Sequence, residues 1–190
     1  MVKVGINGFG RIGRLILRAL LENYKGKIQV VGINDLGSIE TNAHLIKYDS
    51  THGILNQNVQ SISDGFKIGD QNIKVFAERD PSKLPWGKIG VDVVLECTGF
   101  FLDKTSAGKH IQAGAKKVII SAPAKEVDFT LVQGVNSKEL KKNHNVISNG
   151  SCTTNCLAPV AMVLEKTFGI TYGYMTTIHS YTGDQKLLDT

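Results

Sequence analysis

Residues 2–13 read Val-Lys-Val-Gly-Ile-Asn-Gly-Phe-Gly-Arg-Ile-Gly. A short run of apolar, β-branched residues leads directly into the pattern G-x-G-x-x-G over residues 8–13. Residues 11–24 then repeat apolar side chains at the period of a helix, and a second β-branched run follows at residues 28–34. This order predicts a βαβ unit, and therefore a parallel sheet with a right-handed crossover.

Each glycine of the turn is expected to have its own task. Gly8 allows the tight turn, Gly10 lets the backbone approach a pyrophosphate, and Gly13 lets the helix pack close to the strand. The helix N-terminus adds partial positive charge and free N–H groups, to which Arg11 and Ile12 contribute. The turn, in this strand-to-helix context, predicts a dinucleotide-binding site.

An acidic residue ends the second strand. Asp35 lies about 20 residues beyond Gly13, where a carboxylate can accept hydrogen bonds from both ribose hydroxyls of NAD. The same carboxylate would repel the 2′-phosphate of NADP, and no arginine follows it closely. NAD is therefore the predicted cofactor. The alternative is a glycine-rich turn of another α/β fold, with Asp35 as an ordinary turn residue.

The rest of the chain continues to alternate between strand-like and helical patterns. Strands are predicted at residues 59–63, 66–68, 73–77, 91–97, 117–121, 129–135, 145–148 and 172–181, and helices at residues 38–48, 104–113 and 151–168. Residues 1–150 are thus expected to form a doubly wound, mostly parallel α/β domain of the Rossmann type. Residues 151–190 are expected to begin a second, α+β catalytic domain that is truncated. Because residues 188–190 carry no capping or terminating signal, we expect a fragment or a split chain.

The composition is that of an ordinary globular protein, with 42% hydrophobic and 21% charged residues among 190. No apolar run is long enough to span a membrane, and no signal peptide precedes the first strand, so the expected location is the cytoplasm. The net charge of +5 is compatible with phosphorylated metabolites. Lysine and arginine are scattered without a basic tail, so nucleic acid is not expected as the primary partner.

Residues 148–156, Ser-Asn-Gly-Ser-Cys-Thr-Thr-Asn-Cys, join a predicted strand to a predicted helix. Ser151 is the predicted N-cap, which places Cys152 in the first helical turn, where the helix dipole favours a thiolate. The N–H of Cys152 can also stabilise an oxyanion. A metal pair, a disulfide or two buried core residues are the alternatives for Cys152 and Cys156. We expect Cys156 to be a core residue.

A thiol that attacks an aldehyde needs a base, which later acts as an acid. His179 is the best candidate, although a lone histidine on an apolar strand is usually structural. The other histidines are expected at the surface: His44, His52, His110 and His144.

Taken together, these motifs resemble the glyceraldehyde-3-phosphate dehydrogenase family over essentially the whole chain. The matching stretches are residues 5–14, 33–36, 48–53, 96–99, 120–123, 151–156 and 179–182. The string Ser-Cys-Thr-Thr-Asn-Cys is highly specific to that family. One departure is Gly150, where many members have alanine. A larger one is length, because family members continue for well over a hundred further residues.

The resemblance implies a set of roles. The residues that would bind NAD are Arg11, Ile12, Asp35, Arg79 and Ser121, and Thr98 and Gly99 would line the cofactor channel. Cys152 would attack the aldehyde of glyceraldehyde 3-phosphate, His179 would take the hydroxyl proton, and inorganic phosphate would release 1,3-bisphosphoglycerate. Ser151, Thr153 and Thr182 would hold substrate or phosphate oxygens. No metal is implied.

The resemblance also implies a homotetramer for the full-length protein, built with a loop that starts near residue 183. Because much of the second domain would be missing, we expect residues 1–190 alone to be inactive. Two other functions stay open. One is erythrose-4-phosphate dehydrogenase, which shares the cysteine motif but fits residues 180–182 less well. The other is an NAD-binding fragment without catalysis.

Overall fold

The structure, a computed structural model, describes residues 1–180. None of the helices in that range is long and apolar enough to cross a membrane. The elements in chain order are β1 (Val2–Asn7), α1 (Arg11–Asn23), β2 (Ile28–Asn34), α2 (Ile39–Lys47), β3 (Tyr48–Asp49), β4 (Gly53–Ile54), β5 (Val59–Ile62), β6 (Gly65–Ile68), β7 (Gln71–Phe76), η1 (Pro81–Lys83), β8 (Val93–Glu96), α3 (Lys104–Gln112), β9 (Lys117–Ile120), β10 (Phe129–Thr130), η2 (Ser137–Glu139), β11 (Val146–Ser148) and α4 (Cys152–Phe168).

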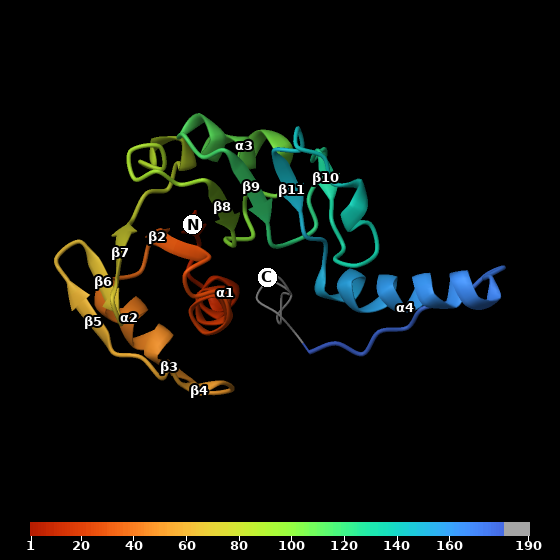
Figure 1. Ribbon diagram of the computed structural model, residues 1–190, viewed down its shortest axis with the longest axis horizontal. Helices are drawn as coiled ribbons and strands as arrows, with labels where there is room; N and C mark the ends of the chain where they lie inside the picture. The colour runs from red at the N-terminus through yellow and green to blue at the C-terminus, as the bar shows by residue number, and fades with distance from the viewer. Residues whose placement is uncertain (181–190) are drawn as a thin grey trace, which may run out of the picture.

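Nine strands form one sheet in the order β10-β11-β9-β8-β1-β2-β7-β6-β5. Neighbours from β10 to β7 are parallel, whereas β7, β6 and β5 pair antiparallel. β1 lies between β2 and β8, so the chain builds outward from β1 in one direction and then in the other (Figure 1). At such a reversal, ligands of doubly wound sheets bind beyond the carboxyl ends of the strands. The predicted α/β class and mostly parallel sheet are confirmed.

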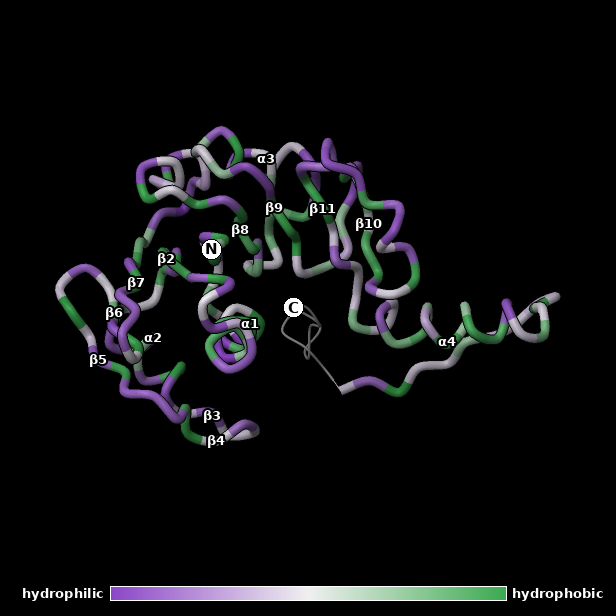
Figure 2. Tube along the Cα trace, in the orientation of Figure 1, coloured by the Kyte–Doolittle hydropathy of each residue, from purple (hydrophilic) through white to green (hydrophobic). Residues whose placement is uncertain are grey.

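Helices cover both faces of the sheet, with α1 and α2 on one side and α3 on the other (Figure 1). Leu17 of α1 and Ile46 of α2 belong to one buried apolar cluster. Ala107 of α3 and Trp86 belong to a second cluster on the opposite face. Figure 2 shows hydrophobic stretches along β8, β9 and β11, which suits strands that are covered on both faces.

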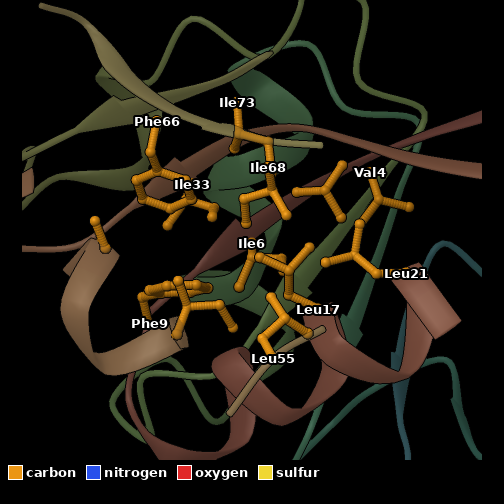
Figure 3. Packing of buried hydrophobic residues seen from close by; sticks show 13 residues of the cluster. Val4, Ile6, Phe9, Leu17, Leu21, Ile33, Leu55, Phe66, Ile68 and Ile73 are labelled. Carbon is orange, nitrogen blue, oxygen red and sulfur yellow. The ribbon is translucent and has the colours of Figure 1, made fainter. Parts of the chain in front are cut away.

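The first cluster also anchors the glycine-rich turn. Phe9 lies within that turn, is 1% exposed, and has its ring centroid 5.8 Å from that of Phe66. Ile6 of β1 and Leu17 of α1 lie beside these rings (Figure 3). Burial of a phenylalanine side chain contributes about 1.5–3 kcal/mol. The turn between β1 and α1 is therefore held by the core as well as by its own backbone.

Local sequence signals predicted several element boundaries correctly. α1 begins at Arg11, and α4 begins after Ser151, whose Oγ accepts from the N–H of Thr154 at 2.9 Å. The antiparallel strands predicted between residues 59 and 77 are present as β5, β6 and β7. These are the places where capping and turn residues act on their immediate neighbours.

The strand predicted over residues 129–135 is wrong beyond Thr130, where β10 ends. The side chain of Asn136 explains the early end. Its Oδ1 accepts from the N–H of Val132, and its Nδ2 donates to the carbonyl of Thr130. Gly134 then adopts a φ of 83°. A side chain thus takes the backbone groups that a longer strand would offer to a neighbour.

The β run predicted over residues 172–181 is also wrong where the structure can test it. Residues 172–180 contain no strand, and Tyr181 lies outside the described residues. A strand needs a neighbouring strand to take its backbone hydrogen bonds. Within residues 1–180, no strand pairs with this segment. A β-rich composition alone did not make it a strand.

The prediction that Cys156 is a core residue is wrong, because its side chain is exposed. It lies on α4, which has no buried residue at all and extends away from the sheet beside β10 (Figure 1). Several apolar side chains on this helix are exposed: Val163 is 57% exposed and Phe168 is 82% exposed. Nothing among residues 1–180 covers α4 as α1, α2 and α3 are covered.

The prediction that His110 lies at the surface is wrong as well. It is 0% exposed, on α3. Its two ring nitrogens both have buried partners, Trp86 Nε1 at 2.9 Å and Glu96 Oε2 at 2.9 Å. Neither partner is close to it in sequence, so no local pattern could have revealed the burial.

Candidate active site

The glycine-rich turn is shaped by how little room it leaves. A Cβ atom on Gly13 would lie 2.2 Å from the carbonyl oxygen of Gly8, so α1 can approach β1 this closely only with glycine there. Gly8 has a φ of 89°, and a Cβ on it would lie 2.8 Å from the backbone nitrogen of Thr98. A Cβ on Gly10, by contrast, would meet no atom within 4 Å. The backbone at Gly10 therefore borders open space that a ligand can enter.

The N-terminus of α1 differs from those of the other three α-helices in the described chain. Gly10 is its N-cap and offers no side-chain hydrogen bond. The N-caps of α2, α3 and α4 are Ser38, Asp103 and Ser151, and each accepts from a backbone N–H of its own helix. The first N–H groups of α1 are thus left available beside open space. That arrangement fits the pyrophosphate of a dinucleotide.

Asp35 is held in place by three donors. Its Oδ2 accepts from the N–H of Phe9 at 2.8 Å, and its Oδ1 accepts from the N–H of Gly37 at 2.8 Å and from Asn42 Nδ2 at 3.3 Å. Asn42 is itself buried, on α2. The carboxylate is therefore tied both to the glycine-rich turn and to the next helix. This tie fixes the distance between the Asp35 carboxylate and the glycine-rich turn.

A cleft of about 520 Å³ opens along the carboxyl ends of β1, β2 and β8. Predicted cofactor residues that line it are Gly8, Gly10, Asp35, Arg79 and Thr98. Gly99 continues the turn after Thr98 with a φ of 77°. Ser121 lies just beyond β9 and donates its backbone N–H to the carbonyl of Glu96 at 3.0 Å. These residues, far apart in sequence, meet along one edge of the sheet.

Arg11 and Ile12 stand at the N-terminus of α1. The guanidinium of Arg11 pairs with Asp49 and lies 3.4 Å from His52 Nδ1. The backbone N–H groups of His52 and Thr51, together with Arg11, hold the pKa of Asp49 well below its usual range. Ile12 is exposed. The side chain of Arg11 is thus engaged by the segment after α2, which leaves its backbone N–H, at the start of α1, as the group available to a ligand.

Cys97 also lines the cleft, but it is not a reactive thiol. Burial raises its pKa to about 12, against a smaller opposing effect of a hydrogen bond with Ser121. At neutral pH this thiol stays protonated. A cysteine beside the cleft is therefore not sufficient for nucleophilic chemistry.

Cys152 has the opposite surroundings. It is exposed, and it is the first residue of α4. Its Sγ lies 3.1 Å from His179 Nε2, and the His179 Nδ1–H donates to the carbonyl of Ser180 at 2.6 Å. That second bond leaves Nε2 as the nitrogen that faces the sulfur. Cys152 and His179, which the sequence suggested as a nucleophile and its base, are 27 positions apart in the chain and in contact.

The pair shifts both titrations in the sense that favours thiolate and imidazolium. The hydrogen bond with His179 is the largest cause that lowers the pKa of Cys152, and bonds with Thr153 lower it further. The bond to the Ser180 carbonyl is the largest cause that raises the pKa of His179, followed by the contact with Cys152. Such a thiolate is a nucleophile, and the imidazolium beside it can donate a proton and, once neutral, accept one.

The segment that leads into α4 is anchored to the same edge of the sheet as the cleft. Asn149 donates its backbone N–H to the carbonyl of Ile120 at 2.9 Å, and Ser148 Oγ donates to the carbonyl of Ala122 at 2.7 Å. Gly150 adopts a φ of 67°, a conformation that glycine accepts more readily than alanine. Glycine, the residue at which the sequence departs from the family pattern, adopts this angle without strain.

The remaining predicted substrate residues are placed only in part. Ser151 caps α4, and Thr153 is half-buried in its first turn, next to Cys152. Thr182 lies outside the described residues. The three polar side chains that end β1, β2 and β8, which are Asn7, Asn34 and Glu96, were missed by the sequence reasoning. A polar residue at the last position of a buried strand was the available signal.

Comparisons with known proteins agree with this geometry. Residues 2–104 match the family described as "Glyceraldehyde 3-phosphate dehydrogenase, NAD binding domain", and residues 151–190 match "Glyceraldehyde 3-phosphate dehydrogenase, C-terminal domain". The chain is 56% identical over 189 residues to glyceraldehyde-3-phosphate dehydrogenase of Xanthobacter flavus and 58% identical over 189 residues to that of Geobacillus stearothermophilus. These alignments cover 100% and 99% of this chain, and 56% of each relative.

A third relative, glyceraldehyde-3-phosphate dehydrogenase 1 of Bacillus subtilis, is 57% identical over 189 residues, which are 99% of this chain and 56% of the relative. The chain therefore spans little more than half the length of the relatives it matches. The likeness is nevertheless continuous from the glycine-rich turn to the cysteine motif. The chain belongs to the glyceraldehyde-3-phosphate dehydrogenase family, and the cofactor of its dinucleotide-binding fold is NAD.

Proposed function

We propose that this chain supplies the NAD-binding half and the reactive thiol of a phosphorylating glyceraldehyde-3-phosphate dehydrogenase. In this proposal, residues 1–150 are the NAD-binding domain and residues 151–190 begin the catalytic domain. The observation that carries the proposal is the 3.1 Å contact between Cys152 Sγ and His179 Nε2 at the N-terminus of α4. The cofactor cleft lies along the same edge of the sheet from which α4 departs.

The first chemical step uses the Cys152–His179 pair. The thiolate attacks the aldehyde carbon of glyceraldehyde 3-phosphate and forms a thiohemiacetal on Cys152. The N–H groups at the start of α4 face the oxygen that becomes negative. The His179 imidazolium gives its Nε2 proton to that oxygen, which makes the hydroxyl of the thiohemiacetal. The neutral Nε2 then takes this proton back as C1 loses hydride, which leaves a thioester on Cys152 and an imidazolium. NAD, when bound, supplies the acceptor of that hydride.

The second step releases the product. An oxygen of inorganic phosphate attacks the thioester carbonyl, and the sulfur leaves as the thiolate that the pair already favours. The product is 1,3-bisphosphoglycerate. Ser151, Thr153 and Thr182 are proposed to hold substrate or phosphate oxygens. Arg79 is proposed to lie near the adenine, and Ser121 near the nicotinamide. The reactive thiol fits a reducing location such as the cytoplasm.

We further propose that turnover needs the length that the relatives have and this chain does not. Support comes from α4, whose apolar side chains and reactive thiol are exposed alike. Water would compete with inorganic phosphate for an exposed thioester, and no element among residues 1–180 shields Cys152. The full-length form is proposed to be a homotetramer.

The test supplies the missing length. Residues 1–190 would be produced alone and together with the remaining segment of the Xanthobacter flavus relative, and NADH formation from glyceraldehyde 3-phosphate would be followed with and without phosphate. We expect phosphate-dependent NADH formation only from the complemented protein, and its loss with Cys152→Ser. If the complemented protein binds NAD but forms no NADH, the proposal fails and a non-catalytic NAD-binding role is favoured. A higher rate on erythrose 4-phosphate would favour that substrate instead.

A further inference from the structure

A buried carboxylate, Glu96, ends β8 beneath the cleft and has no part in the proposed chemistry. It is 0% exposed. Its Oε2 accepts from Asn7 Nδ2 at 2.6 Å and lies 2.9 Å from His110 Nε2. Its Oε1 accepts from the backbone N–H and the hydroxyl of Thr98, at 2.7 Å and 2.5 Å. With donors on both oxygens, the position suits a side chain that accepts on every side, which is a carboxylate.

The histidine in this group has a determined tautomer. The indole N–H of Trp86 can only donate, and it donates to His110 Nδ1 at 2.9 Å. Nδ1 therefore carries no proton, and the ring proton sits on Nε2, which donates to Glu96. His110 is thus neutral, and its donor is fixed on the carboxylate by a residue that cannot reverse the bond.

The hydrogen bonds continue from Glu96 toward the rim of the cleft. Asn7 Oδ1 accepts from Asn34 Nδ2 at 2.7 Å. Asn34 bonds both backbone groups of Glu78, accepting from its N–H and donating to its carbonyl, each at 2.8 Å. Glu78 lines the cleft. One buried chain of side chains thus joins the ends of β1, β2 and β8 to the rim.

The cleft side of Glu96 is the turn that begins at Thr98. The hydroxyl of Thr98 accepts from the N–H of Phe100 at 3.1 Å while it donates to Glu96. The backbone of Thr98 lies so close to Gly8 that a Cβ on Gly8 would approach its nitrogen to 2.8 Å. A displacement of this turn would therefore alter the wall of the cleft directly opposite the glycine-rich turn.

We propose that Glu96 is a positioning residue for dinucleotide binding: its buried carboxylate holds the Thr98 turn against the glycine-rich turn, so that the cleft is formed before the cofactor arrives. The inference rests on the NAD-binding role given above, and it assigns to Glu96 no contact with the cofactor. The Glu96 side chain could act by filling space or by accepting hydrogen bonds, and two substitutions distinguish these roles.

Glu96→Gln keeps the volume of the side chain but turns one acceptor atom into a donor that faces other donors. Glu96→Asp keeps the carboxylate but shortens it by one methylene. We expect the dissociation constant for NAD, measured by calorimetric titration of residues 1–190, to rise about tenfold or more with glutamine and about threefold with aspartate. A space-filling role predicts the reverse order. Asp92→Asn, the same change from carboxylate to amide at a partly exposed site just before β8, is the control and should leave the constant unchanged.

Partial unfolding cannot imitate this result. A variant that is nine-tenths folded loses only about a tenth of its apparent affinity. If Glu96→Gln does not fold, Glu96→Asp still decides, because an unchanged dissociation constant there contradicts the proposal. A dissociation constant for Glu96→Gln within twofold of the wild-type value would overturn the proposal. So would weaker NAD binding by Glu96→Asp than by a folded Glu96→Gln variant.

Hydrogen exchange without NAD tests the same inference independently of the cofactor. We expect Glu96→Gln to speed exchange in peptides that cover residues 7–13 and 97–101, and to leave β5 to β7 unchanged. Unaltered exchange at both turns contradicts the inference. If the wild type fails to bind NAD, the proposed function fails, while the exchange result still decides whether Glu96 holds the two turns together.

Discussion

The sheet and α4 show two different ways in which a sequence prepares a site. In the sheet region, the walls of the cofactor cleft are held in place by packing within the domain. Phe9 ties the glycine-rich turn to the core, and Asp35 ties it to α2. At α4, the thiol is prepared only by its nearest neighbours, the Ser151 cap and the His179 ring. No residue of α4 is buried.

The difference separates activation of a nucleophile from its use. A helix N-terminus and one imidazole suffice to favour the thiolate, and both lie within reach of Cys152 without a surrounding core. Selecting a substrate and excluding water require walls, which the sheet region has around its cleft and α4 does not have within residues 1–180. The two regions should therefore respond to substitution as differently as their burial suggests.

The largest contrast is expected between two apolar truncations. Phe66→Ala removes a fully buried ring in contact with Phe9, and should lower the free energy of unfolding by about 3–5 kcal/mol. Val163→Ala on α4, at a side chain that is 57% exposed, should change it by less than about 0.5 kcal/mol. Denaturant unfolding followed by fluorescence of Trp86, the single tryptophan, measures both. A large loss of unfolding free energy with Val163→Ala would mean that α4 is covered in solution and that the two regions do not differ in packing.

The glycine-rich turn allows a contrast within one region. Gly13→Ala places a Cβ 2.2 Å from the Gly8 carbonyl oxygen, so it should destabilise the fold by about 1–3 kcal/mol and weaken NAD binding. Gly10→Ala meets no atom within 4 Å, so it should leave stability nearly unchanged and weaken NAD binding alone. Thermal unfolding and NAD titration of both variants check this. Equal stability losses would show that the open space at Gly10 is not free.

At α4, the reactivity of the thiols tests activation by the nearest neighbours. Because the pKa of Cys152 is lowered, its rate of alkylation should rise with pH through a midpoint below that of an ordinary thiol. His179→Ala removes the largest cause, so the midpoint should move up and the rate at pH 7 should fall several-fold. Iodoacetamide labelling resolved by peptide mass spectrometry provides the measurement.

Cys97 supplies the internal control for that experiment. Its pKa is raised to about 12 by burial, so it should stay unlabelled in the folded protein across the same pH range. Labelling of Cys97 at the rate of Cys152 would show that the cleft opens readily. A pH profile of Cys152 that His179→Ala leaves in place would mean that the helix N-terminus acts without the imidazole.

The sequence predicted best those features that depend on neighbours in the chain. The turn over residues 8–13 and the Ser151 cap each depend on a few successive residues, so their patterns were sufficient. Family resemblance brought Cys152 and His179 together as a pair, and the structure places them in contact.

Features that depend on distant partners were predicted poorly. His110 can be buried because Trp86 and Glu96 form hydrogen bonds with its two ring nitrogens, and neither residue is near it in sequence. Residues 172–180 read as a strand but have no neighbouring strand in the described chain. Cys156 was predicted to be a core residue, but it lies on a helix that has no buried face. In each case the pattern was real, and the partner decided the outcome.

The smallest expected effect lies at β10 and β11, the edge of the sheet nearest α4. Asp128 accepts from Lys104 Nζ at 2.7 Å and from the N–H groups of Asn145 and Val146, and these bonds, Lys104 first, lower its pKa to about 2. A lowered folded-state pKa contributes stability that is complete above about pH 4 and is lost as the pH falls toward 2. Asp128→Asn should therefore lower the free energy of unfolding by roughly 1 kcal/mol at pH 7, and by progressively less below pH 4. Asp64→Asn, at an exposed ion pair with Lys74, is the matched control and should have almost no effect. If Asp128→Asn is equally silent at pH 7, the well-packed region ends before β10, and the boundary with α4 lies further into the sheet.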